Sequence, residues 1–496
     1  MRNDCLEGTF YMKSDKCRIL GVMLCMVLAA GFCAACQGKA PAPSPGSQTE
    51  LVPAGEENRK MDMIMWYDVD GWVSSMELNP NHPDKPDTAC RVADTYMGGY
   101  SRITEEIALQ HAYWIAASGC NVICCDWTNY TSYRQKGNDF SYNKRIHSNT
   151  DTMLNILDQT TSFEAPSLYV AIRLSEYKYE NLQMVLDDVY TLYEKHQDHW
   201  YRFDDGTENA EKPFIVIFTD VFYNGEEWYD RAQNKWLQNL EFYEDDRFNI
   251  RWSNGYLEVV TEQDENGWFQ IPADRPYWTF VEPYLDEDAG EGCYEVMYSM
   301  GTDGKVEQMS CWASMFAENQ YWDPLNHEIN GKTTFERTLR GVAELSPKAL
   351  LVNRFNYPLA WPEQPQEGLS LYESTHIEPN RDLGFSVFDN VKKNLYLLNC
   401  WRQDAPPAPE CVLTGGDSSE GILTALKSGS ETVRISLTGY PQEYRVSSDP
   451  DMKDAAYQYY NLTDGIVLPE PLKASEGPIY LQTRNAFGES PVTMLE

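Results

Sequence analysis

The stretch MDMIMWYDVDGW, residues 61–72, decides the fold, because it joins a short apolar run to a polar turn that carries two aspartates. Similar apolar runs recur along the chain: NVICCD at 121–126, SLYVAIR at 167–173, PFIVIF at 213–218 and ALLVN at 349–353. Unbroken apolar runs of this length are typical of strands buried on both faces of a parallel sheet. Residues 277–281 and 308–314 are weaker strand candidates.

Segments with helical periodicity separate these runs, and they fall at 103–118, 147–160, 178–195, 335–345 and 383–398. Ser101 or Thr104 can cap the first helix, and Gly119 fits its end. Strands alternating with helices over about 340 residues predict a (β/α)₈ TIM barrel over 61–403, with an open doubly wound sheet as the alternative. The acidic and aromatic residues 220–272 are predicted to form an insertion in the barrel.

The composition changes after residue 403, where DAPPAP (404–409) is typical of a linker. The segment beyond it carries short strand candidates between Gly, Pro and Asp turns, at 432–438, 443–446, 456–460 and 479–482. We therefore expect a small C-terminal antiparallel β-sandwich over 410–496, which packs on the barrel or binds sugar.

The first sixty residues are typical of an exported, anchored protein. Residues 19–35 are apolar and follow Lys13, Lys16 and Arg18, and CAACQ (33–37) resembles a bacterial lipobox. We predict a signal peptide over 1–36, read from Met1 or Met12, with a lipid on Cys36; Cys33 or plain secretion is the alternative. The polar, Pro-rich residues 37–60 fit a flexible linker. The expected location is the bacterial cell envelope, lipid-anchored at the outer membrane or cell surface, or outside the cell.

Charge and composition bear on which partners and cofactors the protein can bind. The formal net charge is −36, which disfavours nucleic acid, because phosphate binding needs clustered Lys and Arg. Core and barrel packing accounts for most of the 14 Trp and 32 Tyr, and the excess favours a carbohydrate partner. The sequence lacks phosphate-binding loops, dinucleotide fingerprints and metal-ligand spacings of Cys or His, so we assign no cofactor and no metal. Separately, we expect a monomer.

Acidic residues follow the predicted strands, at the edge where barrel enzymes place their chemistry. The acids are Asp68, Asp70, Asp126, Asp220, Glu282, Glu318, Glu373 and Glu378. Any one of them can be a helix cap or an ion-pair partner. Together with nearby Trp and Tyr they suit glycoside hydrolysis, in which one carboxylic acid protonates the leaving oxygen and a second carboxylate generates the nucleophile.

Four segments resemble glycoside hydrolase family 99 and its endo-α-mannosidase-like relatives. They are YMGGYS at 96–101, ASGCNVICCDW at 117–127, LVNRFN at 351–356 and ESTHIEP at 373–379. The similarity extends over roughly residues 61–400 and is weak between its ends, which marks a distant relationship. It implies a TIM barrel with carboxylate chemistry.

Residue by residue, the resemblance assigns Glu373 as the general acid/base, and it aligns Asn356 and Glu378 with the same signature. The position of the family's other catalytic glutamate is Tyr357 here, followed by an insertion over 358–371. Glu363, Glu367, Glu282 or Asp126 could replace the missing carboxylate.

The sequence thus predicts an exported glycoside hydrolase acting on a polysaccharide or complex glycan, with Glu373 as acid/base and Glu282 or Asp126 as its partner. The expected substrate contacts are Trp66, Tyr67, Asp68, Tyr100, Trp127, Asn356, Tyr357, Trp361, His376 and Glu378. Because Tyr357 replaces a catalytic glutamate, a cell-surface glycan-binding lipoprotein without activity is the alternative, and a purely structural surface protein is a third reading.

Overall fold

The first apolar run forms strand β1 (Asp62–Tyr67), near the middle of an eleven-stranded sheet ordered β10-β11-β13-β14-β17-β1-β3-β4-β5-β9-β12. The computed structural model describes residues 61–70, 90–91, 94–130, 132, 140–173, 179–219, 221–223, 228–230, 235–237, 245–254, 261–280, 296–313, 315–317, 320–322, 331–360, 372–398, 409, 413–414, 421–429, 432–435 and 439–495. All of these residues belong to one compact unit, Pro53–Glu496.

Eight consecutive strands of this sheet run parallel. They are β14 (Val306–Trp312), β17 (Ala349–Asn353), β1, β3 (Val122–Trp127), β4 (Ser167–Arg173), β5 (Phe214–Phe218), β9 (Asn249–Asn254) and β12 (Tyr277–Thr279). The sheet curls, and its ends are bridged by a side chain: the Thr279 N–H donates to Gln308 Oε1 (2.6 Å), and Gln308 Nε2 donates to the Thr279 carbonyl (3.1 Å). A curled parallel sheet of this kind fits the expected TIM-barrel-like fold.

Three short strands extend the sheet beyond β14: β13 (Met297–Met300), β11 (Phe269–Ile271) and β10 (Glu262–Gln263). Three smaller sheets accompany it. They are β18 (Asn356–Ala360) with β19 (Tyr372–His376) and β2 (Cys90–Arg91), β15 (Met315–Ala317) with β16 (Gln320–Trp322), and β6 (Val221–Tyr223) with β7 (Trp228–Asp230) and β8 (Lys235–Leu237). The last of these lies within the segment 220–272 that was expected to be an insertion.

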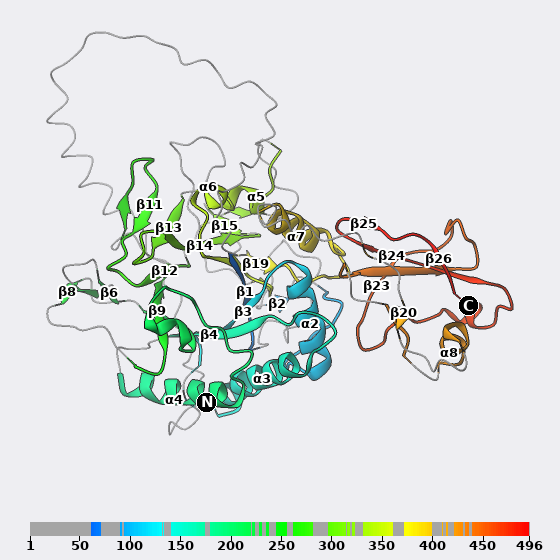
Figure 1. The fold of residues 1–496 in the computed structure, drawn as a ribbon, viewed down its shortest axis with the longest axis horizontal. Helices are drawn as coiled ribbons and strands as arrows, with labels where there is room; N and C mark the ends of the chain where they lie inside the picture. Colours follow the sequence, from blue (N-terminus) through cyan, green and yellow to red (C-terminus); the bar gives the residue numbers. More distant parts are fainter. Residues whose placement is uncertain are drawn as a thin grey trace, which may run out of the picture. The chain divides into compact units, whose positions relative to one another are not determined.

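Helices α2 (Glu105–Ala117), α3 (Phe140–Gln159) and α4 (Tyr179–Lys195) lie beside β1, β3 and β4 (Figure 1). Thr104 is the N-cap of α2, since its side chain accepts from the Ile107 N–H, and Gly119 follows the helix with φ +97°. The helix predicted over 335–345 is two short ones, α5 (Thr334–Thr338) and α6 (Val342–Leu345), because Gly341 between them adopts φ +82°. The remaining long helix is α7 (Ser386–Leu398), and η2 (Glu208–Glu211) is a 3₁₀ turn. None of the described helices combines the length and apolar character that a bilayer crossing requires.

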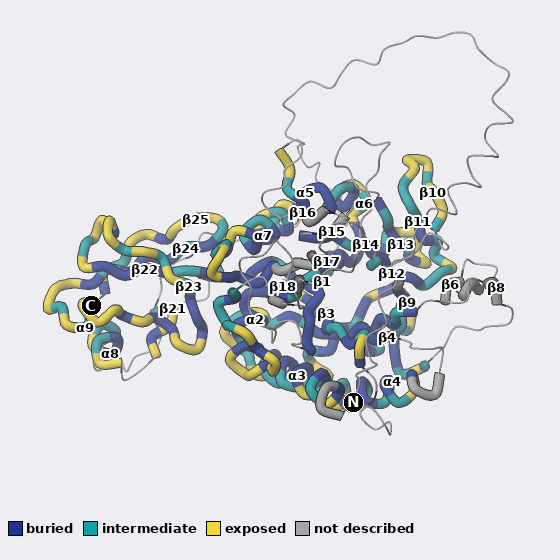
Figure 2. The backbone as a smooth tube through the Cα atoms, turned by 180° about the vertical axis from the view of Figure 1, so that it is seen from behind, coloured by how far each residue is buried: buried dark blue, intermediate teal, exposed yellow. Residues whose placement is uncertain are grey.

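Side chains alternate between two apolar layers along each parallel strand, as the period of a strand requires. The inner layer fills the curl and includes Ile64, Trp66, Val122, Cys124, Tyr169, Ala171, Phe214, Val216, Trp278 and Leu351. The outer layer, which includes Met65, Tyr67, Cys125 and Trp127, packs against the helices. The parallel strands are therefore buried on both faces, as the dark tube of Figure 2 makes clear for β1, β3 and β4. Cys120, Cys124, Cys125 and Cys311 are buried free thiols.

The largest sheet among the described C-terminal residues is a five-stranded antiparallel one. Its strands are β22 (Glu443–Ser447), β23 (Gln458–Tyr459), β24 (Ile479–Asn485), β25 (Gly488–Glu489) and β26 (Thr493–Leu495). A separate ribbon of β20 (Leu413–Thr414) and β21 (Arg434–Ile435) and the helices α8 (Ile422–Ser428) and α9 (Glu470–Lys473) accompany it. The β-sandwich is therefore not confirmed within the described residues, where the predicted run 432–438 is described only over 432–435 and holds β21.

Hydrogen bonds join the C-terminal sheet to the helices that surround the curled sheet. Tyr113 on α2 donates to the Pro441 carbonyl (2.6 Å), and Gln110 on α2 accepts from the Leu462 N–H (2.9 Å). Both α2 residues are buried. Because buried polar groups need partners, these bonds fix the C-terminal sheet on α2.

We predict that Gly465→Ala destabilises the C-terminal sheet by about 2–4 kcal/mol. Gly465 has φ +64°, and an added Cβ would lie 2.8 Å from Thr432 Cγ2 and closer still to the Val433 carbonyl. Gly429→Ala is the matched control, since Gly429 has φ +62° but no atom within 4 Å of an added Cβ, so its loss is about 1 kcal/mol. Urea unfolding measures both, and equal losses would contradict the steric argument.

Candidate active site

Acidic residues from two neighbouring strands meet at the carboxyl edge of the parallel array, which we call the mouth. Met65 and Trp66 on β1 are in register with Ile123 and Cys124 on β3, so Asp68, just beyond β1, lies beside Asp126 near the end of β3. The charges of Asp70 and Asp126 both act on Asp68, as their proximity requires. The sequence-based expectation that acids from separate strands gather at this edge therefore holds for these three residues.

Asp126 is the acid of the three that solvent reaches, since it is half-buried whereas Asp68 and Asp70 are buried. Its Oδ1 accepts hydrogen bonds from the Thr128 N–H (2.8 Å) and the Thr128 hydroxyl (2.6 Å). Within the described part of the chain, no side-chain or backbone donor is bonded to its Oδ2. One carboxylate oxygen is thus fixed by the protein while the other can meet a ligand.

Asp68 and Asp126 differ in their protonation. Burial, followed by the negative charges of Asp70 and Asp126, raises the pKa of Asp68 well above its usual value. Burial also raises the pKa of Asp126, but the hydrogen bonds from Thr128 and the positive charge of Arg354 act in the opposite direction. Asp68 therefore keeps its proton at a pH at which Asp126 is ionised, and this separation reduces the repulsion between them.

Aromatic rings fill the inside of the curl below these acids. Trp66 lies 4.5 Å from Phe280 and 5.7 Å from Phe218, measured between ring centroids, and Phe280 lies 6.0 Å from Trp312. Phe218 and Phe280 are only half-buried, so their rings reach the surface of the mouth. The Arg354 guanidinium lies over the rings of Trp312 (5.8 Å) and Tyr357 (4.5 Å). Flat apolar surfaces beside polar groups suit a sugar ring.

Two side chains on the inner face carry buried polar atoms without a hydrogen-bond partner in the described structure. They are Trp66, through Nε1, and Asn353, through both amide atoms. Asn353 directly follows Val352, which is in register with Met65 of β1, so it lies beside Trp66 at the base of the mouth. An unmet buried polar group costs about 1–3 kcal/mol, so these atoms favour the presence of a polar ligand or water there.

A second group of predicted residues converges in a buried hydrogen-bond network beside the mouth. Tyr67 OH lies 2.8 Å from His111 Nδ1, and His111 Nε2 lies 3.2 Å from Glu378 Oε1. Tyr100 OH donates to Glu378 Oε2 (3.1 Å), and Asn356 Nδ2 donates to Tyr100 OH (3.1 Å). Asn356 also accepts from the Asp68 N–H (2.8 Å) and donates to the Asp68 carbonyl (3.0 Å).

This network positions the end of β1 rather than presenting groups to solvent. All of its members are at most 5% exposed, and burial raises the pKa of the Tyr67 hydroxyl well above its usual value. Through Asn356 it fixes the backbone of Asp68 relative to β18. Contact of Tyr67, Tyr100, Asn356 and Glu378 with a substrate stays a prediction, since their polar atoms are engaged with one another.

We predict that Glu378→Ala lowers the free energy of unfolding by about 3 kcal/mol, because it leaves Tyr100 and His111 buried without their shared acceptor. Glu378 and His111 are both 0% exposed, so bulk water does not reach their hydrogen bond in the parent protein. Glu344→Ala on the exposed side of α6 is the control and should change stability by less than about 0.5 kcal/mol. Urea unfolding at neutral pH distinguishes them, and a loss below about 1 kcal/mol for Glu378→Ala would contradict a tight network.

The other sequence-predicted residues fall into three groups. Trp127 is fully buried in the outer layer, where its Nε1 donates to Thr150 on α3 (2.8 Å), so its ring packs behind the sheet. Glu373 and His376 lie on β19, whose backbone alone is described, and Asn356 on β18 pairs with His376. Glu282, Trp361 and the lipidation residue Cys36 lie outside the described residues, as do Glu363, Glu367, Asp220 and Glu318.

Sequence reasoning missed the aromatic interior and the cation. Phe218, Phe280, Trp312 and Arg354 were not singled out, although three of the four occupy inner positions at strand ends. The sequence contained a signal for these positions, because alternate residues of a strand face the same side. Every second residue, as with Ile64 and Trp66 on β1, therefore faces the inside of the curl. The same alternation places Trp127 on the outer face.

Comparisons with known proteins return distant structural neighbours only. The GH99 endo-α-mannosidase from Bacteroides thetaiotaomicron in complex with bis-tris propane shares 12% identity at a TM-score of 0.37, over 69% of this chain and 98% of that one. A second structure of that enzyme shares 11% at 0.36, over 69% and 99%. A glycoside hydrolase-like protein shares 11% at 0.35, over 71% and 96%. No family model and no curated protein matches the sequence. The neighbours include the family that the sequence resembles, at a distance too great to carry an argument about activity.

Proposed function

We propose that the protein is a glycoside hydrolase whose curled sheet is a (β/α)₈ barrel, and that a glycan binds at its mouth. The observation that carries this proposal is Asp126, a half-buried carboxylate with one oxygen held by Thr128 and the other directed to no described donor. It stands over the aromatic interior formed by Trp66, Phe218 and Phe280. Such a carboxylate beside apolar ring faces is what cleavage of a sugar acetal requires.

In the proposed reaction, Asp126 is the ionised carboxylate that activates the nucleophile or stabilises positive charge on the sugar. Asp68, which keeps its proton, adds no second negative charge and so leaves Asp126 ionised at a lower pH than two charged neighbours would allow. The Arg354 guanidinium further favours the ionised form of Asp126. Holding these groups before the substrate arrives is the protein's contribution to the rate.

Glu373 is the proposed acid/base that donates a proton to the leaving oxygen. It pairs with Leu359 in the β18–β19 hairpin, three residue pairs from Asn356, which is bonded to Asp68. At about 3.3 Å per residue, its backbone lies about 10 Å along the hairpin from this attachment.

The experiment is incubation of the full chain with a panel of polysaccharides and N-linked glycans, followed by detection of new reducing ends. We expect Glu373→Gln to lower the turnover of the best substrate by about 10²–10⁴ while the unfolding midpoint stays the same. The matched control is Glu344→Gln, on the exposed side of α6. Glu336→Gln is unsuitable as a control, because Glu336 belongs to the capping box of α5. Turnover by Glu373→Gln equal to that of the parent would remove Glu373 as the acid, and release of no sugar from any member of the panel would overturn the activity.

One observation favours a second function, binding of a glycan without cleavage. Tyr357 occupies the position of the resembled family's second catalytic glutamate, and its ring is covered by the Arg354 guanidinium at 4.5 Å. A neutral ring at this position supplies a binding surface and no base. Calorimetry on the same glycan panel, combined with detection of released sugar, distinguishes the two functions. Saturable binding with no released sugar would favour binding without cleavage.

We also propose that the chain is exported and anchored through a lipid on Cys36, followed by the flexible linker 37–60, so that the enzyme acts at the bacterial surface. The support is the sequence CAACQ after an apolar, positively flanked segment. Mass spectrometry of the mature protein tests it. We expect the added mass of a diacylglyceryl group on Cys36, and we expect it to be absent from Cys36→Ser. An unmodified mature chain that begins at another residue would contradict the lipid anchor.

A further inference from the structure

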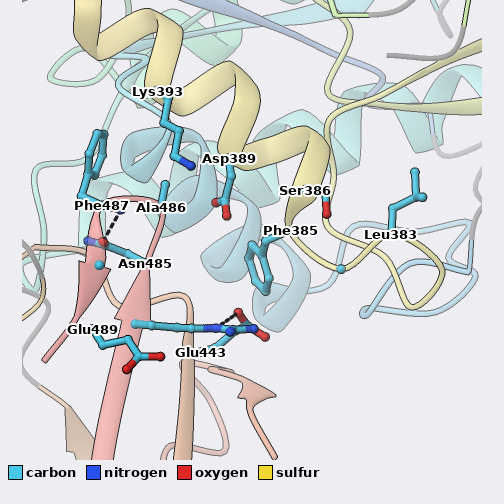
Figure 3. A pocket seen from close by; sticks show the side chains of 13 residues that line it. Leu383, Phe385, Ser386, Asp389, Lys393, Glu443, Asn485, Ala486, Phe487 and Glu489 are labelled. Atoms are coloured by element: carbon cyan, nitrogen blue, oxygen red, sulfur yellow. Dashed lines mark hydrogen bonds and ion pairs between the residues drawn. The ribbon is translucent and has the colours of Figure 1, made fainter. Parts of the chain in front are cut away.

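A cavity lies far along the chain from the mouth residues, between the start of α7 and the C-terminal sheet (Figure 3). We call it the seam groove. Its polar lining comes from both sides: Ser386, Asp389 and Lys393 from α7, and Glu443, Arg484 and Glu489 from β22, β24 and β25. None of the mouth residues lines it, so it is a separate place on the molecule.

Three polar groups of the seam groove, Asp389, Glu443 and Arg484, are held in place before any ligand arrives. Glu443 Oε2 accepts from Arg484 Nε at 2.6 Å, and Asp389 Oδ1 accepts from Gln442 Nε2 at 2.6 Å. The guanidinium of Arg484 is also stacked on Tyr457, 3.9 Å from the ring centroid. Fixed donors and acceptors lose little conformational freedom on binding, which favours affinity.

The charges in the seam groove nearly cancel. Asp389, Glu443 and Glu489 oppose Lys393 and Arg484, and burial raises the pKa of Asp389, which reduces the negative excess. A strongly charged ligand would meet like charges in such a groove. A ligand with many hydroxyl groups would meet acceptors and donors alternately, because each hydroxyl both donates and accepts.

One wall of the seam groove is an aromatic ring that solvent reaches. Phe487 is 37% exposed, and its ring is held by Tyr396 of α7 in an edge-to-face contact at 5.3 Å. In Figure 3, Phe487 and Lys393 stand together at one end of the groove, across from Glu489. An exposed ring in a groove that also contains carboxylates and cations suits the apolar C–H face of a pyranose.

We propose that the seam groove binds a neutral oligosaccharide at a site distinct from the mouth. Two parts of the chain build this site jointly, so the C-terminal sheet completes a binding surface that α7 alone does not provide. The proposal goes beyond hydrolysis and does not depend on it, because binding at the seam groove needs none of the acids at the mouth.

The test uses the full chain carrying Asp126→Asn, so that no substrate is consumed during titration. Calorimetry with mannohexaose, xylohexaose and cellohexaose is expected to give saturable binding of at least one of them. Adding Phe487→Ala should weaken that binding by about tenfold or more, and adding Lys393→Ala by several-fold. Leu397→Ala, which removes a 54% exposed side chain of α7 outside the groove, is the matched control and should leave binding unchanged.

Several results would overturn the proposal. They are no binding of any neutral hexasaccharide at millimolar concentration, binding of charged oligouronides alone, or equal affinity in Phe487→Ala, Lys393→Ala and the parent. Lys393 lies on an exposed helix surface, so its variant stays informative if Phe487→Ala fails to fold. The proposed hydrolase activity is tested separately, by sugar release from the parent chain without Asp126→Asn. If the parent releases no sugar, the hydrolase proposal fails, but the proposed binding at the seam groove is not affected.

Discussion

Asp126→Asn is expected to lower kcat on the best glycan substrate by about 10²–10⁴ without a change in the unfolding midpoint. The amide oxygen of asparagine can still accept from the Thr128 N–H and hydroxyl, which at 2.8 and 2.6 Å hold Oδ1 of the aspartate. The local structure is therefore retained, whereas the negative charge that the reaction needs is lost. Initial rates at saturating substrate measure the effect.

The pH profile provides an independent check on the role of Asp126. If Asp126 acts in its ionised form, the rate rises with pH through its pKa, which burial raises above the ordinary carboxyl value of about 3.9. Asp126→Asn should abolish this rise along with most of the rate. Asp451→Asn, which removes an exposed carboxylate paired with Lys453, is the control and should leave both unchanged. A parent-like profile in Asp126→Asn would show that another carboxylate sets the acid limb.

Much of the fold follows from local sequence. The runs at 121–126, 167–173 and 213–218 became β3, β4 and β5, because a continuous apolar run must be covered on both faces and the intervening helices cover one of them. The closure of the curl could not be predicted in this way. Among the described residues it depends on side-chain contacts between β14 and β12, in which Gln308 is bonded to Thr279 and Trp278 Nε1 donates to Glu307.

The candidate site was predicted unevenly for a related reason. Asp68 follows one strand that sequence identifies and Asp126 ends another, so their meeting at one edge could be inferred from topology. Tyr67 and Trp127 neighbour them in sequence but point to the opposite layer, where each packs against a helix. Adjacent residues on a strand face opposite sides, so a contact prediction based on sequence proximity alone mixes the two layers.

The seam between α7 and the C-terminal sheet contains a buried cation, which the sequence analysis did not predict. Lys392 is 0% exposed, and its Nζ donates to Gln442 Oε1 (3.1 Å), a neutral acceptor. Burial lowers the pKa of Lys392 to about 7, although the neighbouring Asp389 acts to raise it. In the unfolded chain the same ammonium has a pKa of about 10.4. The folded state therefore binds fewer protons than the unfolded state between these two values.

Stability should consequently rise as the pH increases from 7 towards 10, because unfolding takes up a proton that the buried amine lacks. At pH 6 the amine is charged in both states, and the folded state bears the whole cost of burying it, about 4–5 kcal/mol. Lys392→Met removes this cost. Gln442 Oε1 keeps a donor in the variant, since it also accepts from the Ala486 N–H (3.2 Å).

We therefore expect Lys392→Met to raise the free energy of unfolding by about 2–4 kcal/mol at pH 6 and by less than about 1 kcal/mol at pH 10. Urea unfolding at pH 6, 8 and 10 measures the difference between parent and variant. Lys393→Met is the control, since its exposed side chain one position along α7 should change stability by less than about 0.5 kcal/mol at every pH. A difference between Lys392→Met and the parent that stays constant across this range would mean that Lys392 is protonated in the folded protein, held by Asp389, and that the seam tolerates its charge.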